Sequence, residues 1–346
     1  MHMKVIFESE YRKEYIDLLD QVFDSGFLSQ GKVQEQFESL FAESAGLECA
    51  AVSNGGAALG MLYEYANVKG GDVLVPANTF WATTAAAIRS GGRPVYVDCN
   101  RDDLCMSFDD LRRKITSDTR AVCVTHIGGH IAFEIEQIAE FCAHRNIVLI
   151  EDCAHAHGAD WNGKTAGSWG LGGAYSFYAT KTMPLGEGGM LVSRNADFIQ
   201  WAKMHRNYGK AVCDGRVTYP DPNGFNFRMN EVTAALGIVQ LKRLPKILEW
   251  KARLAERFDR IFERRVCFPE GMVSGFYKYI VFDYDLAEET GRVFDRTDFG
   301  NEIQAVPADI PNAEWIADHH RCAPIWYGWE KADLPDDELK KALGVN

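Results

Sequence analysis

The sequence predicts an α/β protein whose central sheet is mostly parallel and is covered by helices on both faces. Short apolar runs that can form buried strands alternate with amphipathic runs at helical spacing, and this order is typical of parallel sheets. The chain also has 346 residues, which exceeds the usual size of one compact unit. We therefore expect a large domain over residues 1–245 and a small domain over residues 246–346.

The first half of the chain carries this pattern clearly. A continuous apolar run at 147–150 ends in Glu151 and Asp152. Because ligands collect at the carboxyl ends of parallel strands, Asp152 is a candidate site residue. Strands are predicted at 50–52, 72–76, 95–98, 121–125 and 147–150, and helices at 8–22, 33–45, 57–65, 82–90, 108–115 and 134–145.

The second half is less regular. Residues 205–224 are rich in turn formers and are expected to be mobile. A long helix over 231–262, interrupted near Pro245, is expected to bridge to the small domain. The aromatic segment 319–329 either covers part of a site or only packs. Strands are predicted at 174–178, 189–193 and 277–282, and a helix at 196–204.

Composition and charge disfavour several classes of function. The net charge of −12 argues against a broad nucleic-acid surface. Nine cysteines lie apart without a CxxC pair, so we expect neither a zinc site nor disulfides, and the expected location is a reducing cytoplasm. The first fifteen residues carry charges throughout, and no uncharged run is long enough to span a bilayer. We expect no nucleic acid, no metal and no membrane among the partners.

Lys181 is the first candidate for chemistry. It lies between the apolar run 174–178 and a turn that contains Gly186, Gly188 and Gly189. A lysine amine held between buried elements has a lowered pKa and can attack a carbonyl as a neutral nucleophile. The alternative is that Lys181 is an ordinary solvated charge, as most lysines are.

A second candidate is the turn at residues 53–56, SNGG, which leads from a strand directly into a helix. Unpaired N–H groups at a helix N-terminus and the helix dipole favour an anion such as phosphate. Glycine joints of this kind also occur without any ligand, so the turn alone leaves both interpretations open.

Two other patterns are set aside. Residues 158–165 match the letters of a phosphate-binding P-loop, but no strand precedes them directly and the following AGSWGLGG cannot sustain a helix. A tight turn at Asn162 and Gly163 between two short strands explains them better. His126 and His130 have a spacing that could suggest metal ligands, but the two glycines between them make an ordered helix improbable.

Four features together describe one cofactor. They are the anion cradle at 54–57, the aromatic ring of Trp81, the strand-end carboxylate of Asp152 and the fixed amine of Lys181. Pyridoxal phosphate needs its phosphate anchored, its ring covered, its pyridine nitrogen kept protonated and its aldehyde bonded to an amine. Lys181, once displaced by a substrate amine, is then free to move a proton.

Several segments also share their order and wording with a known family. They are FxSxGxxxxxFE (27–38), SNGGAAL (53–59), VPANTFWAT (75–83), VYVDCN (95–100), IEDCAHAHGA (150–159), YSFYATKTMPLGEGG (175–189), HRNYG (205–209) and GFNFRMNEVTAALGIVQL (224–241). In these segments the chain resembles the DegT/DnrJ/EryC1/StrS family of sugar aminotransferases, which are fold type I pyridoxal-phosphate enzymes. The resemblance covers roughly residues 25–245, thins after Val266, and implies a smaller C-terminal α+β domain.

The resemblance implies roles around the cofactor ring. Lys181 would bind the cofactor aldehyde covalently, Asp152 would pair with the pyridine nitrogen, and Trp81 would stack on the ring. His155, at a position that is often glutamine, would lie near the ring and its phenolic oxygen.

The resemblance also implies how the phosphate is held. Gly55, Gly56 and Ala57, with Ser176, would bind it, although Gly56 stands where threonine is usual and leaves only a backbone donor there. The asparagine that matches Asn226 reaches the phosphate of the neighbouring subunit, so the resemblance implies a homodimer with shared active sites. In the sequence, the Asn226 amide has no obvious local partner.

The implied activity is transfer of an amino group from L-glutamate or glutamine to a keto group of a nucleotide-linked deoxysugar. Two alternatives stay open. The acceptor could be a cyclitol ketone or a related natural-product precursor, or the chain could bind pyridoxal phosphate as a regulatory protein without turnover.

Overall fold

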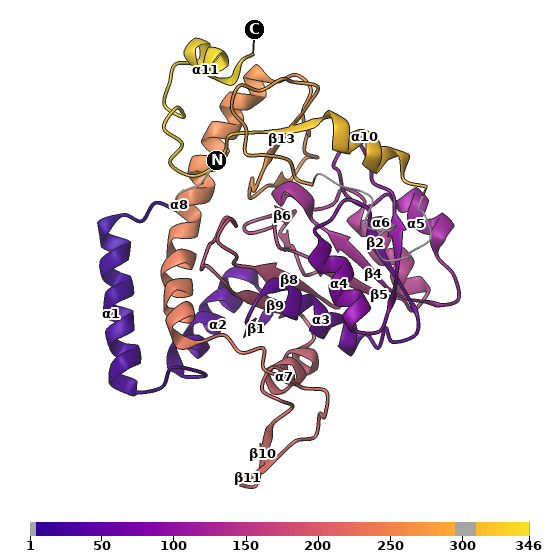
Figure 1. The fold of residues 1–346 in the computed structure, drawn as a ribbon, viewed down its shortest axis with the longest axis vertical. Coiled ribbons are helices and arrows are strands. Elements are labelled where there is room, and N and C mark those ends of the chain that lie inside the picture. The colour runs from indigo at the N-terminus through magenta and orange to yellow at the C-terminus, as the bar shows by residue number, and fades with distance from the viewer. Residues whose placement is uncertain (1–4, 295–308, 346) are drawn as a thin grey trace.

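A seven-stranded sheet forms the centre of the computed structural model, which describes residues 5–294 and 309–345 (Figure 1). The strand order is β1-β9-β8-β5-β4-β2-β3. The pairs from β8 to β3 are parallel, and β9 runs antiparallel to both of its neighbours. The predicted mostly parallel sheet is thus confirmed. Its strands are β1 (Glu48–Val52), β2 (Asp72–Pro76), β3 (Arg93–Val97), β4 (Thr119–Thr125), β5 (Val148–Asp152), β8 (Gly172–Ser176) and β9 (Gly189–Ser193).

The helices of the large sheet follow the predicted order. Each of the first two ends at a glycine in the left-handed region, Gly26 with φ 70° and Gly46 with φ 66°, where other residues would be strained. They are α1 (Ser9–Ser25), α2 (Lys32–Ala45), α3 (Gly55–Tyr65), α4 (Trp81–Arg89), α5 (Phe108–Lys114), α6 (Ile135–His144) and α7 (Ala196–His205).

The long helix α8 (Glu231–Ile261) is continuous, so the predicted interruption near Pro245 is wrong. Pro245 is exposed, while Arg243, Leu244 and Ile247 on either side are buried. Packing of the buried face against the rest of the molecule therefore maintains the helix across a residue that cannot donate its backbone bond. The expected domain boundary at 245/246 falls inside this helix.

Glu231, the first residue of α8, joins two segments that are far apart in the sequence. Its carboxylate accepts backbone N–H bonds from Gly31 (2.9 Å), Val33 (3.0 Å) and Gln34 (3.0 Å) at the start of α2. A carboxylate at a helix N-terminus satisfies otherwise unpaired donors and interacts favourably with the helix dipole. This contact fixes α8 against α2.

The last turns of α8 belong to a second, smaller hydrophobic core. Leu254, Phe258 and Phe262 pack there with Tyr279 and Leu339. Two antiparallel strands and a terminal helix complete it, and the predicted strand at 277–282 is confirmed in part. The elements are β13 (Tyr279–Phe282), β14 (His320–Ala323) and α11 (Asp336–Leu343).

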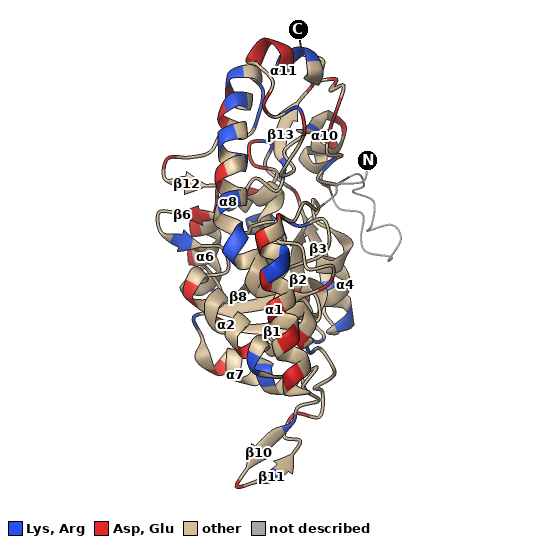
Figure 2. Ribbon diagram, turned by 90° about the vertical axis from the view of Figure 1, so that its left-hand side faces the viewer, with Lys and Arg blue, Asp and Glu red and all other residues tan. Residues whose placement is uncertain are grey.

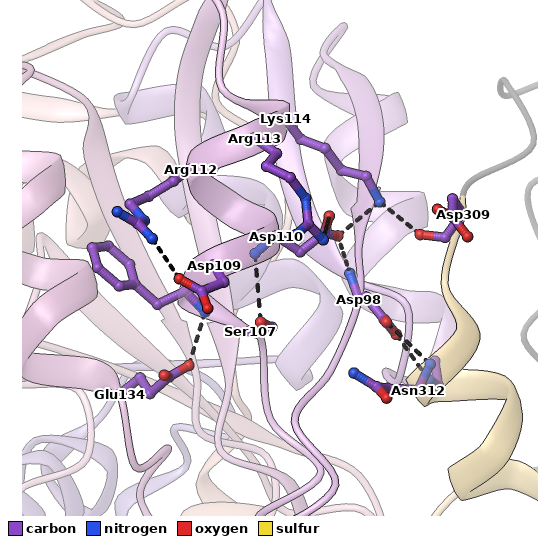
Figure 3. A network of polar contacts seen from close by, with 12 residues as sticks. Asp98, Ser107, Asp109, Asp110, Arg112, Arg113, Lys114, Glu134, Asp309 and Asn312 are labelled. Atoms are coloured by element: carbon purple, nitrogen blue, oxygen red, sulfur yellow. Dashed lines mark hydrogen bonds and ion pairs between the residues drawn. The ribbon is translucent and has the colours of Figure 1, made fainter.

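Helix α10 (Pro311–His319) connects this C-terminal part to the large sheet (Figure 3). The Asp98 carboxylate, directly after β3, accepts the backbone N–H groups of Asn312 (3.0 Å) and Ala313 (2.8 Å). The Lys114 amine donates to the carbonyl oxygen of Asp309 at 3.2 Å. Both contacts hold the start of α10 beside α5.

Two small hairpins lie outside the large sheet. Asn162 and Gly163 have φ values of 52° and 80° between β6 (Asp160–Trp161) and β7 (Lys164–Thr165), which confirms the predicted tight turn. The turn-rich stretch 205–224 contains a hairpin that its sequence did not indicate. Its strands, β10 (Ala211–Cys213) and β11 (Arg216–Thr218), project beyond α7 (Figures 1 and 2).

Residues of both charges are spread over the helices, as the blue and red segments along α8 show in Figure 2. Within residues 5–294 and 309–345, no helix combines the length and the hydropathy needed to cross a membrane. All nine cysteines lie in these residues, and each is a free thiol.

Candidate active site

A cavity of about 550 Å³ opens where β4, β5 and β8 end and α3 begins. It lies at the carboxyl end of the parallel strands, where α/β proteins bind their ligands. Six of the nine predicted site residues line it, and they come from three separate segments of the chain. They are Gly55, Gly56, Asp152, His155, Ser176 and Lys181.

Lys181 is held by the backbone around it. Its N–H donates to the carbonyl of Tyr178 at 2.9 Å, and the N–H of Leu185 closes the same turn on the carbonyl of Phe177 at 2.8 Å. Burial lowers the pKa of the Lys181 amine to about 8, the carboxylate of Asp152 raises it in part, and the cation of Lys278 lowers it further. A larger fraction of this amine is therefore neutral near neutral pH than of an exposed lysine.

Asp152 is 4% exposed and is oriented through both of its carboxylate oxygens. Thr83 donates its hydroxyl to Oδ2 at 2.7 Å, and the N–H of Ala154 donates to Oδ1 at 3.0 Å. Thr83 is also hydrogen bonded to Thr79 at 2.8 Å, and Thr79 to Thr125 at 3.0 Å. The sequence reasoning missed these threonines, although Thr79 and Thr83 lie in the VPANTFWAT segment.

The N-terminus of α3 packs directly against Ser176. A Cβ atom at Gly55 would lie 2.9 Å from the Cβ of Ser176, so the approach requires glycine. The N–H of Ala57 donates to the side chain of Asn54 at 2.8 Å, and Ala57 is not among the described residues that line the cavity. Gly55 and Gly56 therefore face the cavity, whereas the Ala57 donor is already engaged.

His155 stacks on Tyr277, with ring centres 4.0 Å apart and planes at 24°. The N–H of Gly128 donates to its Nδ1 at 3.4 Å. Burial, with the cations of Lys181 and Lys278, lowers the His155 pKa well below its usual value, so the imidazole is neutral. Tyr277 also lies under the Lys181 amine, 4.9 Å from the ring centre. Sequence reasoning assigned Tyr277 only to a strand and missed this contact.

The remaining two predicted residues do not line this cavity, as far as the described residues show. Trp81 is the first residue of α4, and its neighbours Phe80 and Ala82 line the cavity instead. Asn226 is exposed, and its side-chain oxygen accepts the N–H of Arg228 at 3.4 Å. The expectation that this amide has no local partner is therefore wrong, because the chain turns back on itself at this point.

Glu151, beside Asp152 in β5, has a structural role. Its carboxylate accepts N–H bonds from Gly167 (2.6 Å), Trp169 (2.7 Å) and Gly170 (2.9 Å) and pairs with His126 Nε2 at 2.9 Å. Glu151, His126 and Cys153 are close enough together to hold a metal ion. The carboxylate oxygens are already engaged by the loop at 167–170, however, so the cluster is explained by packing of that loop.

Known proteins resemble this chain over most of its length. GDP-perosamine synthase of Vibrio cholerae is 36% identical over 69% of this chain, and the match spans 65% of that relative. dTDP-4-dehydro-2,3,6-trideoxy-D-glucose 4-aminotransferase of Saccharopolyspora spinosa is 31% identical, over 78% of this chain and 74% of the relative. The crystal structure of the aminotransferase TlmJ from Streptoalloteichus hindustanus superimposes with a TM-score of 0.85 at 27% identity, covering 98% of this chain and 95% of that one.

The profile of the DegT/DnrJ/EryC1/StrS aminotransferase family matches residues 9–273, which include every segment of the cavity except its C-terminal wall at Tyr277 and Val293. This match over more than half of the chain shows that it belongs to the DegT/DnrJ/EryC1/StrS aminotransferase family.

Proposed function

We propose that this protein uses pyridoxal 5′-phosphate to transfer an amino group from L-glutamate or glutamine to a keto group of a nucleotide-linked deoxysugar. One observation carries the proposal: Lys181 and Asp152 line a single cavity together with the glycine-opened N-terminus of α3. Two of the relatives are named for GDP- and dTDP-linked sugars, and this supports the choice of substrate class.

The residues present fit this cofactor. The cavity volume of about 550 Å³ lies in the range of small-molecule sites. The α3 N-terminus offers the N–H groups of Gly55 and Gly56 and the hydroxyl of Ser176 to a phosphate. The tight packing of Gly55 on Ser176 leaves no room for a larger residue in this cradle.

Each charged residue then has a defined task. Pyridoxal phosphate supplies an electron sink for breaking bonds at the carbon next to an amine. Asp152, fixed by Thr83 and Ala154, would hold a proton on the pyridine nitrogen. Lys181 would bind the cofactor aldehyde and, once released, move a proton at the substrate carbon. Neutral His155 and Trp81 would flank the ring. Ala57 would join the phosphate site if its N–H left the side chain of Asn54.

Borohydride reduction followed by peptide mass spectrometry tests cofactor attachment. We expect the mass of the reduced cofactor on the peptide that contains Lys181, and no added mass on that peptide in Lys181→Ala. Lys210→Ala, which changes an exposed lysine, is the control and should still carry the cofactor on the Lys181 peptide. Asp152→Asn should retain cofactor but lose most turnover, because a neutral partner no longer keeps the pyridine nitrogen charged. Attachment at a different lysine contradicts the assignment.

Amino transfer itself is tested with ¹⁵N-labelled glutamate and amide-labelled glutamine. A panel of GDP-, dTDP- and UDP-linked keto-deoxysugars and free keto-cyclitols serves as acceptors, and aminated product is detected by mass. We expect product from a nucleotide-linked sugar. Product only from a cyclitol would favour that alternative substrate, and cofactor binding without any product would favour a regulatory protein.

We also propose a homodimer in which Asn226 contacts the phosphate in its partner's site. Asn226 is exposed and lies outside the cavity of its own chain. Large apolar side chains in the same stretch of the chain are exposed too, among them Tyr208 (46%), Phe225 (54%) and Tyr219 (64%), as expected for a surface that a second copy covers.

Subunit exchange tests this arrangement. Lys181→Ala chains and Asn226→Asp chains are each inactive alone if Asn226 holds the phosphate, because the added carboxylate repels it. In a mixed dimer with shared sites, one site carries both changes and the other carries neither, so activity returns. No recovery on mixing, or a strictly monomeric protein in solution, would contradict the proposal.

A further inference from the structure

A second, smaller cavity adjoins the first one behind Lys181. Its volume is about 80 Å³, and Thr180, Lys181 and Tyr277 line both cavities. Its other lining residues include Lys251 of α8 and Trp326 of the C-terminal aromatic segment, together with residues of the N-terminal stretch, of the loop at 179–184 and of the region 278–290. The aromatic segment at 319–329 thus covers part of a cavity.

The lining of this second cavity is rich in cations. Lys181, Arg243, Lys251 and Lys278 all face it. Arg243 pairs with Glu8 at 3.0 Å, Asp152 acts on Lys181 from the first cavity, and the Lys278 amine donates to the carbonyl of Thr290 at 2.6 Å. Positive charges gathered in a small cavity with low-dielectric walls attract an anion.

Lys251 is a deeply buried cation in the lining of this cavity. It is 5% exposed, and its amine donates to the carbonyl of Phe276 at 2.7 Å. No carboxylate of residues 5–294 or 309–345 forms an ion pair with it. Burial and the cation of Lys278 lower its pKa to about 7. A buried ammonium group without an anionic partner is costly, so a bound anion would stabilise it.

Unused hydrogen-bond donors point to the same conclusion. Thr182 lines the cavity, is 6% exposed, and its hydroxyl has no partner among the described residues. The Nε of Arg243 is likewise buried without one. The cavity volume of about 80 Å³ is several times the roughly 10–15 Å³ that one water molecule needs, so a carboxylate has room there.

We propose that this cavity is a carboxylate subsite, in which Lys251, Lys278 and Thr182 hold a carboxylate of the amino donor. The inference rests on the proposed function, because it assumes that the donor amine reaches the position of the Lys181 amine. Lys181 borders both cavities, so a donor bound there can extend its carboxylate into the second one. A keto sugar without a carboxylate would bind only in the first cavity. The two substrates would therefore be distinguished by their charge.

Binding of glutarate and acetate to the full chain, with and without cofactor, tests the subsite directly. Trp326 lines the cavity, so its fluorescence reports on occupancy, with Trp326→Phe assigning the signal. We expect saturable binding that Lys251→Met weakens about 10- to 100-fold, as for loss of a charged hydrogen bond. Lys242→Met, exposed on the same helix, is the matched control and should bind as the wild type does. Equal binding by Lys251→Met and wild type overturns the proposal.

Two further arms separate the possible outcomes. If Lys251→Met does not fold, Thr182→Val replaces it, with the same expected direction. In the cofactor-loaded protein, the first half-reaction is followed with L-alanine, 4-aminobutyrate and butylamine. If Lys251→Met slows the half-reaction of L-alanine, the subsite binds the donor's α-carboxylate. If it slows the half-reaction of 4-aminobutyrate, the subsite binds the distal carboxylate. If it slows neither, the subsite is refuted.

The proposal and the function on which it rests can fail separately. Glutarate binding that depends on Lys251, without amino transfer to any keto sugar, would refute the function and leave the subsite. Transfer from glutamate with an unchanged KM in Lys251→Met would refute the subsite and leave the function.

Discussion

The titration of Lys181 offers a direct test of how the site is built. Its pKa is about 8 instead of the ordinary 10.5. At pH 7 an amine with a pKa of 8 is about 9% neutral, whereas one with a pKa of 10.5 is about 0.03% neutral. The fold therefore makes the neutral, nucleophilic form about 300 times more abundant.

Two substitutions should move this pKa in opposite directions. Lys278→Gln removes a neighbouring cation and should raise it, because the charged form of Lys181 is then opposed less. Asp152→Asn removes a neighbouring anion and should lower it. Burial, the main cause, is unchanged in both variants, so the pKa should stay below the ordinary value in each.

Competitive labelling measures this pKa in the cofactor-free chain. A trace of acetic anhydride is applied from about pH 6 to about pH 11, beside a free lysine derivative as the reference, and the Lys181 peptide is quantified by mass spectrometry. A midpoint of about 10 or above would refute the lowering of the Lys181 pKa by burial, and shifts of the same sign in the two variants would refute the opposite effects of Lys278 and Asp152.

Two further predictions concern packing and pH. Gly55→Ala should lower the free energy of unfolding by about 1–3 kcal/mol and weaken cofactor binding, because its Cβ meets Ser176. Gly60→Ala in the same helix, with open space at its Cβ, should raise stability by about 0.5–1 kcal/mol, and urea unfolding of both variants checks the pair. His205 is buried, which disfavours its charge, but its interactions with the carboxylates of Glu64 and Asp221 raise its pKa above 6.5. Its contribution to stability should be complete below about pH 6.5 and lost as pH rises through the raised pKa, so unfolding across that range should show a decrease that His205→Gln abolishes.

The sequence by itself predicted the strands of the large sheet and the helices that accompany them. Strand and helix patterns repeat over a few residues, so the predicted runs at 72–76, 82–90 and 189–193 differ from the observed elements by at most one residue at either end. It also indicated Lys181 and Asp152, because each follows an apolar strand in a local context that is rare. Pro245 misled the prediction, since a local helix breaker was weighed without the buried faces on both sides of it.

The tertiary structure alone decided which residues meet. Thr83 and Asp152 are 69 positions apart, and only the order of β2, β4 and β5 in the sheet brings the hydroxyl to the carboxylate. Tyr277 reaches His155 and Lys181 only because the C-terminal part folds back over the site. Residues 181, 251 and 278 show no common pattern in the sequence, yet they line one cavity. Periodicity reports on neighbours along the chain, whereas burial, pKa and charge clustering depend on neighbours in space.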